Sequence, residues 1–325
     1  MDALIESFDT AQQWLFEQLL QPLMFALGLG NLLEDGYAAT GWLLVGLLQL
    51  LVMITLFRAL ERWRPVEPVS DPAAVRVDVI YTLIHRLGLV RVVLFFAIEP
   101  LWDALSGQMR LAGVPTLQLE ALWPGVSDIP WVSFLLYLLL FDFVNYWLHR
   151  AQHQFHWWWQ LHALHHSQRQ MTLWSDTRNH LLDDVLIDAA FVLLARLVGV
   201  GPGQFVALVA ISQLVESFSH ANVRLWFGAW LERLLVSPRF HRRHHAIGIG
   251  HEAEGGRGTL GGCNFAVLFP IWDQLFGTAD WQLRYEPTGI RDQLPQEGGR
   301  DYGRGFWAQQ WLGLRRLAGQ LLPRR

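Results

Sequence analysis

The chain has 325 residues, of which 52% are hydrophobic and only 17% charged. This balance excludes an ordinary soluble domain and favours a membrane protein, because a soluble core could not bury so much apolar surface. The net charge of -4, without an arginine-rich stripe among aromatic residues, leaves no basis for nucleic-acid binding. The only cysteine, Cys263, excludes an internal disulfide, a cysteine-ligated zinc site and a protein-held iron–sulfur cluster.

Several stretches approach the roughly 20 apolar residues that a helix needs to cross a bilayer. We therefore expect an all-α fold, a multi-pass transmembrane helical bundle of about four or five spans. An apolar stretch over residues 12–29 precedes them and is interrupted by Glu17 and Pro22, which favours a helix in the membrane interface. In chain order, the predicted spans are residues 41–56, 79–101, 131–148, 185–200 and 205–218.

Two of these regions have features that bear on their shape. The span at 79–101 contains His85 and Arg86, so it is either one tilted helix that faces protein on one side or two broken pieces. The glycine- and proline-rich segment 199–203 predicts a turn between two short helices. Residues 185–218 should therefore form a membrane hairpin.

The arginine residues predict the orientation of the chain. The first 57 residues contain no arginine or lysine, so we expect no cleavable signal peptide. Arg58 and two further arginines follow the first span, and the positive-inside rule places residues 58–76 in the cytoplasm. Counting spans onward brings residues 149–184, and everything after Ser219, to the same face. We therefore expect a histidine-rich helical cap on the cytoplasmic side.

The histidines are crowded, since 12 of the 13 lie between His149 and His251. Residues 149–153 form an HxxxH motif, which places both imidazoles on one face of a helix, one turn apart. Residues 162–166 and 241–245 each form an HxxHH motif, whose three imidazoles lean toward one side. One ion accepts about four to six ligands, so eight or more imidazoles suit two ions, and imidazole binds iron, zinc and copper alike. The eight are His149, His153, His162, His165, His166, His241, His244 and His245.

The region from Asp142 to Thr278 resembles the fatty acid hydroxylase and sterol desaturase superfamily of membrane di-iron enzymes. Asp142, Tyr146 and Arg150 accompany the first motif, and both HxxHH motifs match the family pattern. Residues 264–278, NFAVLFPIWDQLFGT, are similar to the family's terminal N...WD..FGT signature. By this resemblance, the eight motif histidines are iron ligands.

The resemblance implies two further ligands and several residues that support them. His180 lies in an R-x-H element, although the proline that commonly follows is Leu181 here, and His220 lies where the hairpin ends. Some relatives have a histidine four residues earlier, where this chain has Glu216, so either Glu216 ligates metal or the site has one nitrogen fewer. Carboxylates near the motifs are candidates to accept the outer N–H of ligand imidazoles: Asp142, Asp176, Asp183, Asp184 and Asp273.

The implied activity is hydroxylation of a lipid by two iron ions and O2, with desaturation of a lipid as the alternative. The substrate could be a fatty acyl chain, a sterol, an ether lipid or an aminolipid. The chain has no GxGxxG motif and no recognisable cytochrome b5 domain, so a separate ferredoxin, cytochrome b5 or reductase should supply electrons.

Two other functional classes fit less well. A membrane zinc hydrolase is disfavoured because HExxH is absent and His251-Glu252 lacks the second histidine. A metal transporter would place its polar residues within the spans.

These expectations divide the chain into three regions. Residues 1–130 would be an N-terminal membrane region with an interfacial helix and two spans. Residues 131–285 would form the histidine-box di-iron catalytic domain, including the membrane hairpin 185–218. Residues 286–325 would be a C-terminal cytoplasmic tail.

Overall fold

The computed structural model describes residues 2–247 and 261–322, and of residues 2, 4 and 90–100 it describes the backbone alone. The pair His251-Glu252 and the C-terminal Arg325 lie outside the described residues. Within the described ranges every regular element is a helix, and one isolated antiparallel bridge joins Ala246 to Thr288. The expectation of an all-α fold is confirmed for this part of the chain.

The described chain contains α-helices together with short π- and 3-10 helices. In chain order they are α1 (Asp2–Leu15), the π-helix η1 (Phe16–Leu20), α2 (Gln21–Ala26), η2 (Gly30–Leu32), α3 (Leu33–Val52), the π-helix η3 (Met53–Phe57), α4 (Arg58–Trp63), α5 (Pro72–Arg86), α6 (Leu89–Leu111), η4 (Leu119–Ala121), α7 (Pro130–Gln154), α8 (His156–His166), α9 (Leu181–Val198), α10 (Pro202–Ser219), α11 (Gly228–Leu231), α12 (Pro238–His244), α13 (Ile271–Leu275), η5 (Arg291–Gln293), η6 (Pro295–Glu297) and α14 (Phe306–Leu321).

Two helical runs in the described chain are long and apolar enough to cross a membrane, Gly30–Trp63 and Pro130–Gln154. They contain the predicted spans 41–56 and 131–148 and extend both. On the first run, large apolar side chains such as Leu51 point outward, where 58% of its surface is exposed. A bilayer is the solvent in which such a surface is stable.

The predicted span 79–101 consists of two helices, which was one of the two expected shapes. Helix α5 ends at Arg86 and α6 begins at Leu89, and between them Gly88 has φ +77°. Glycine adopts this left-handed conformation without the steric cost that a side chain brings. Helix α3 approaches the end of α5 closely, because a Cβ atom at Gly46 would lie 1.7 Å from the carbonyl oxygen of Arg86.

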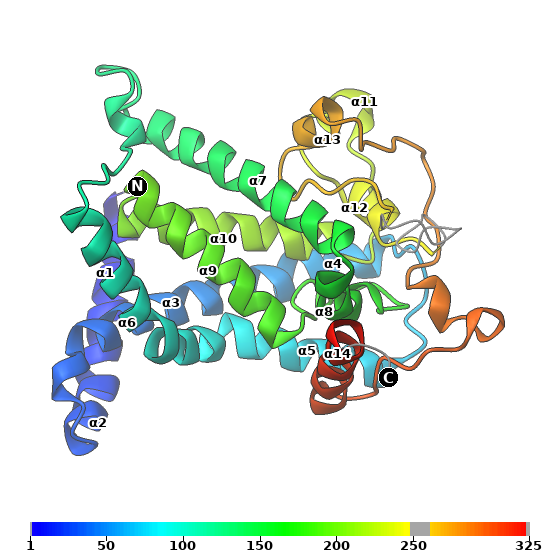
Figure 1. Cartoon of the computed structure of the whole chain (residues 1–325), viewed down its shortest axis with the longest axis horizontal. Coiled ribbons are helices and arrows are strands. Elements are labelled where there is room, and N and C mark those ends of the chain that lie inside the picture. Colours follow the sequence, from blue (N-terminus) through cyan, green and yellow to red (C-terminus); the bar gives the residue numbers. More distant parts are fainter. Residues whose placement is uncertain (1, 248–260, 323–325) are drawn as a thin grey trace.

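The expected hairpin is present as α9 and α10. Gly199, with φ +65°, ends α9, and Pro202 occupies the first turn of α10. The hairpin packs against α7 through a buried apolar cluster: Tyr137, Leu138, Phe141, Val198, Leu208, Val267 and Leu268. Figure 1 shows α3, α5, α7, α9 and α10 running lengthwise, with α8, α12 and α14 gathered at the end where α7 and α10 finish.

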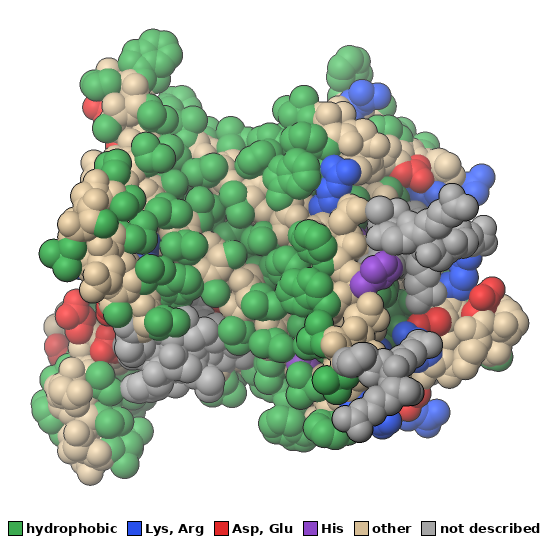
Figure 2. All heavy atoms as spheres, in the orientation of Figure 1, with side chains coloured by type: hydrophobic (Ala, Val, Ile, Leu, Met, Phe, Trp, Pro, Cys, Tyr) green, Lys and Arg blue, Asp and Glu red, His purple; other side chains and the backbone are tan. Residues whose placement is uncertain are grey.

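The surface of the molecule has two chemical characters. On the face drawn in Figure 2, hydrophobic side chains cover the lengthwise helices, whereas the visible arginines gather at the end that holds α12 and the C-terminal segments. This division agrees with a membrane-embedded body and a polar cap.

The C-terminal segment is packed against the cap. Helix α14 lies against α8, and Gln310 Nε2 donates a hydrogen bond to the hydroxyl of Tyr81 over 2.9 Å. A Cβ atom at Gly313 of α14 would lie 2.4 Å from the ring of His180. The segment predicted as a tail therefore contributes to the structure around α8.

Candidate metal centre

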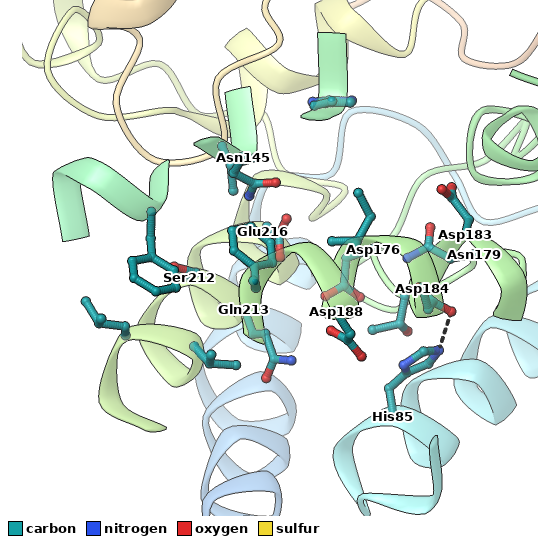
Figure 3. Close-up of a pocket in the computed structure, with 18 of the residues that line it drawn as sticks. His85, Asn145, Asp176, Asn179, Asp183, Asp184, Asp188, Ser212, Gln213 and Glu216 are labelled. Atoms are coloured by element: carbon teal, nitrogen blue, oxygen red, sulfur yellow. Dashed lines mark ion pairs between the residues drawn. The ribbon is translucent and has the colours of Figure 1, made fainter. Parts of the chain in front are cut away.

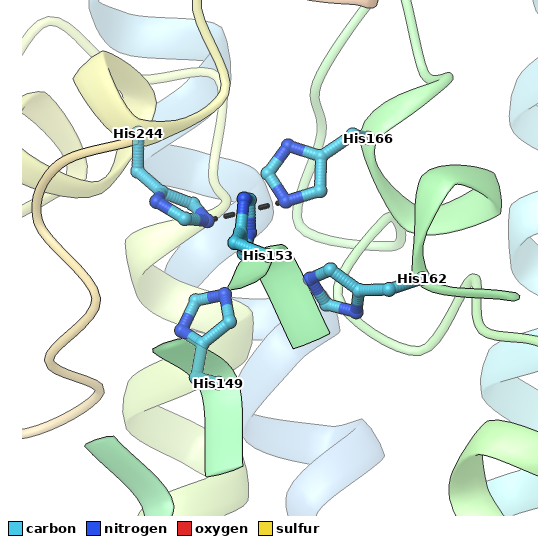
Figure 4. Close-up of side chains that lie close together, drawn as sticks. All are labelled: His149, His153, His162, His166 and His244. Carbon is cyan, nitrogen blue, oxygen red and sulfur yellow. Dashed lines mark hydrogen bonds between the residues drawn. The ribbon is translucent and has the colours of Figure 1, made fainter. Parts of the chain in front are cut away.

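Nine buried histidines form two groups whose possible ligand atoms lie within 4.8 Å of one another. In Figure 4, the five rings of the first group point toward one space from α7, α8 and the segment that carries His244. The first group is His149, His153, His162, His166 and His244, and the second is His165, His220, His241 and His245. The structure thus brings together all eight motif histidines and His220.

Helix geometry divides each HxxHH motif between the two groups. In α8, the first and fifth positions, His162 and His166, belong to the first group, and the fourth belongs to the second. The motif of α12 is divided in the opposite sense, so that only its fourth position, His244, belongs to the first group. Positions i and i+4 lie on one face of a helix. Each motif therefore supplies two nitrogens to one group and one nitrogen to the other.

Hydrogen bonds orient three rings of the first group. The Nδ1 atoms of His149 and His244 lie 2.8 and 2.7 Å from carbonyl oxygens of Phe265 and Cys263, which only accept hydrogen bonds. Each Nδ1 must therefore carry the proton, which leaves a lone pair on Nε2 of the neutral ring. His162 Nδ1 lies 3.3 Å from Asp183 Oδ2, and its Nε2 is buried with no hydrogen-bond partner among the described residues. A buried nitrogen with a free lone pair suits a metal ion.

The four rings of the second group turn nitrogens toward one another. His220 Nδ1 donates to the carbonyl oxygen of Glu216 over 2.8 Å, so its Nε2 carries a lone pair. That Nε2 lies 3.1 Å from the Nε2 atoms of both His165 and His241. The Nε2 atoms of His245 and His241 are 3.2 Å apart. Nitrogens this close need either a proton or a metal ion between them.

The local environment makes a divalent cation a better shared charge than protons. Burial lowers the pKa of His165, His241 and His245 well below the usual value, and neighbouring imidazoles lower the pKa further. Burial also lowers the pKa of His220. Neutral imidazole is the form that binds metal. The donor set consists of nitrogen alone, which fits iron, zinc or copper.

Only Asp183, among the predicted carboxylates, makes a described hydrogen bond to a ligand ring. Its oxygens also accept from Gln152 Nε2 at 2.9 Å and from Trp158 Nε1 at 2.6 Å. These two donors hold the carboxylate against His162. Sequence reasoning missed Gln152 and Trp158, which carry no motif of their own.

Asp142 and Asp273 act through the backbone, which corrects the expectation of direct contact with ligand rings. Asp273 accepts hydrogen bonds from the backbone N–H groups of Phe265 and Ala266, at 2.9 and 2.8 Å. Asp142 likewise accepts from Leu268 N at 2.9 Å, and from Phe269 N and Trp272 Nε1. Together they fix the irregular segment whose carbonyl at position 265 orients His149.

Asp176 and Asp184 do not support ligand rings either. Asp176 Oδ2 accepts from Arg86 Nη2 at 2.9 Å, and Asp184 Oδ2 lies 3.4 Å from His85 Nε2. Both carboxylates instead line a cavity beside the two histidine groups. His85 lies outside both groups, as does the exposed His156.

The structure does not support His180 as a ligand. His180 caps the start of α9, where its Nδ1 accepts from Leu182 N at 3.1 Å. Its Nε2 lies 2.9 Å from the carbonyl oxygen of Gln310, so both ring nitrogens are used. Glu216 is also outside both groups. Of the two alternatives for Glu216, the geometry favours a site with one nitrogen fewer.

A cavity of about 410 Å³ adjoins the histidines. Ligand candidates from both groups line it, among them His149, His165 and His241, and so do apolar residues of the hairpin such as Phe191 and Leu208. Figure 3 shows the polar residues of its wall. A flexible apolar molecule could lie in this cavity beside the histidine nitrogens.

Comparison with known proteins identifies relatives of this region. Residues 134–278 match the family described as fatty acid hydroxylase. The chain is 28% identical over 168 residues to ornithine lipid hydroxylase OlsE of Rhizobium tropici, covering 52% of this chain and 46% of that protein. It is 29% identical over 155 residues to human alkylglycerol monooxygenase, covering 46% of this chain and 31% of the relative.

A third relative is a sterol enzyme. The chain is 27% identical over 188 residues to Delta(7)-sterol 5(6)-desaturase ERG3B of Gibberella zeae, covering 57% of this chain and 53% of that one. The chain thus matches about half or less of the length of these relatives. No solved structure gives a significant match. Residues 134–278, which contain both histidine groups, thus match the fatty acid hydroxylase family, and the relatives support membership of the fatty acid hydroxylase and sterol desaturase superfamily.

Proposed function

We propose that the chain is a membrane di-iron oxygenase that hydroxylates a lipid, using O2 and electrons from a separate donor. The observation that carries this proposal is the division of nine buried histidines into two adjacent groups at the end of an amphipathic cavity. Two groups suit two ions. The relatives are named as a lipid hydroxylase, a monooxygenase and a desaturase, which supports an oxidation of lipid.

The residues divide the work between holding metal and shaping its surroundings. The five histidines of the first group would hold one iron ion, and the four histidines of the second group would hold the other. Bound iron would supply O2 activation and the oxidation of an unactivated C–H bond, which no side chain can perform unaided. Asp183 and the carbonyl groups of Phe265 and Cys263 hold the Nδ1 protons of three rings, so each Nε2 faces its group.

The cavity would receive the substrate and exclude water. Phe141, Phe191 and Leu208 form apolar wall between α7, α9 and α10. Such a wall suits an acyl chain or another extended hydrocarbon that enters from the bilayer. We further propose that the span count, the cytoplasmic position of the cap, and a catalytic region over residues 131–285 are as the sequence predicts.

Desaturation is the second candidate reaction, because a sterol desaturase is among the relatives. Comparative lipidomics of cells with and without the gene distinguishes the two reactions. Hydroxylation adds one oxygen to a lipid, whereas desaturation removes two hydrogens. A lipid profile that does not change, under O2 and with a donor system present, would overturn both.

Elemental analysis of the purified chain tests the metal centre separately. We expect two irons per chain, and loss of iron from His162→Ala and from His241→Ala, one variant for each group. Full lipid oxidation by both variants would contradict the di-iron centre. Zinc alone, together with hydrolysis of an ester or amide, would instead indicate a membrane zinc hydrolase.

A further inference from the structure

The cavity beside the two histidine groups changes from polar to apolar along its length. On α10, Glu216 is four residues from His220, which is about 6 Å along the axis, and Gln213 is about 10 Å away. Leu208 and Phe205 lie farther along the same helix, at about 18 and 22 Å. The cavity therefore has a polar section next to the histidines and an apolar section beyond it.

The polar section holds more negative than positive groups. Asp176, Asp184 and Glu216 line it, and Figure 3 shows all three around the same space. Arg86 pairs with Asp176, and His85 lies 3.4 Å from Asp184. No described arginine other than Arg86 lines the cavity. Asp183 and Asp188 also line the cavity, so its carboxylates outnumber Arg86 and His85 together.

Two carboxylates of the polar section, those of Glu216 and Asp176, have oxygen atoms that accept no hydrogen bond from the described residues. The carboxylate of Glu216 makes no described hydrogen bond or ion pair, whereas its backbone carbonyl accepts from His220 Nδ1 and from Ser219 Oγ. Asp176 is only 7% exposed, and its Oδ2 accepts from Arg86 and from Ser217 Oγ at 2.5 Å. Its Oδ1 is buried and has no hydrogen-bond partner in the part of the chain that the structure describes. A buried acceptor without a donor is destabilising unless a ligand supplies one.

We propose that this polar section is a subsite for the protonated amine of an amphiphilic substrate, with Glu216 as its main carboxylate. An ammonium group would donate hydrogen bonds to Glu216 and to Asp176 Oδ1 and would offset the excess negative charge. The hydrocarbon part would extend into the apolar section formed by α9 and α10. The substrate class is then a lipid that carries a basic amine.

This inference rests on the proposed function for its location beside the metal groups, but it is tested by binding alone. The full chain is placed in phosphatidylcholine nanodiscs and titrated with dodecylamine, dodecanol or dodecanoate, which share one chain length. Thermal stabilisation reports binding, and nanodiscs without protein correct for partition. We expect dodecylamine to bind about tenfold more tightly than dodecanol, since a hydrogen bond to a charged group contributes that much or more.

The matched variants are Glu216→Gln and Glu297→Gln, the latter at an exposed site far from the cavity in sequence. Glu216→Gln should reduce the preference for amine to less than about threefold while leaving dodecanol binding unchanged, which also shows that the variant is folded. It should also strengthen dodecanoate binding, because a repelling charge is gone. Glu297→Gln should behave as the unmodified chain.

Two outcomes would overturn the subsite. One is equal binding of amine and alcohol by the unmodified chain, and the other is an amine preference that survives in Glu216→Gln. The assay needs neither iron nor an electron donor. Lipid oxidation without amine preference would therefore refute the subsite and keep the oxygenase, whereas amine preference without any lipid oxidation would do the reverse.

Discussion

At the scale of single residues, the contact between Asp183 and His162 is the most direct test of how the rings are held. Asp183→Asn removes the charge that accepts the Nδ1 proton of His162. We expect iron affinity to fall about 10- to 100-fold, as is typical when such a partner of a metal ligand is lost. Competition with a chelator measures this affinity. Asp184→Asn, at the neighbouring position facing His85, should retain iron; equal loss in both variants would contradict the assigned role.

His180 and His220 form a second pair for comparison. Both are buried, and each lies at a helix end, His180 before α9 and His220 after α10. His220→Ala should lose the ion of the second group, because that group has only four nitrogens. His180→Ala should keep both ions, since its nitrogens bind Leu182 and Gln310. Elemental analysis measures the iron per chain in each variant. Two irons retained in His220→Ala would refute the assignment of His220 as a metal ligand.

The sequence could predict those site residues that lie within a few positions of one another in the chain. The spacing of HxxxH and HxxHH brings imidazoles close together on a helix by geometry alone, so their eight histidines could be predicted, although the division of each HxxHH between two groups was not. His180 stands alone in its segment, where a helix cap and a ligand look the same. The carbonyl groups of Cys263 and Phe265 carry no sequence signal, because every residue has one.

At the scale of helices, the contact of α3 with α5 depends on a missing side chain. Gly46→Ala would force a Cβ atom against the Arg86 carbonyl, which cannot move without displacing the end of α5. We expect destabilisation of about 1–3 kcal/mol, typical of overpacking. Thermal unfolding in detergent measures it. Gly319→Ala, in a helix with open space around the site, should be neutral or stabilising, and a comparable loss there would refute a specific contact.

The helices themselves were predictable, but some of their boundaries and contacts were not. Apolar runs identified α3, α7, α9 and α10, and glycine with proline identified the hairpin turn. The break at Gly88 depends on a single glycine in an apolar run, where a continuous helix is equally compatible with the sequence. The packing of α14 on α8 joins segments far apart in the chain, so no local pattern reports it.

At the scale of the whole molecule, the arginine distribution predicts the orientation in the membrane. Cysteines introduced at Arg169 and Gly113, both exposed, should react with impermeant reagents from opposite sides. We expect Arg169→Cys to be labelled from the cytoplasm and Gly113→Cys from outside, with a reporter after Arg325 also cytoplasmic. The native Cys263 is buried and gives a low background. Labelling of Arg169→Cys and a reporter after Arg325 on opposite faces would exclude a single site built from both regions.

The division of each HxxHH motif between the two groups has a consequence for how metal is acquired. His165 and His166 are adjacent in the chain, as are His244 and His245, and in each pair the two residues belong to different groups. The first ion to arrive would therefore fix the backbone that presents nitrogens to the second, and binding free energies of the two ions would be coupled. Uptake should be cooperative. In a native mass spectrometry titration, chains with no ion and with two ions should predominate, and an abundant one-ion species at half saturation would show that the two groups fill independently.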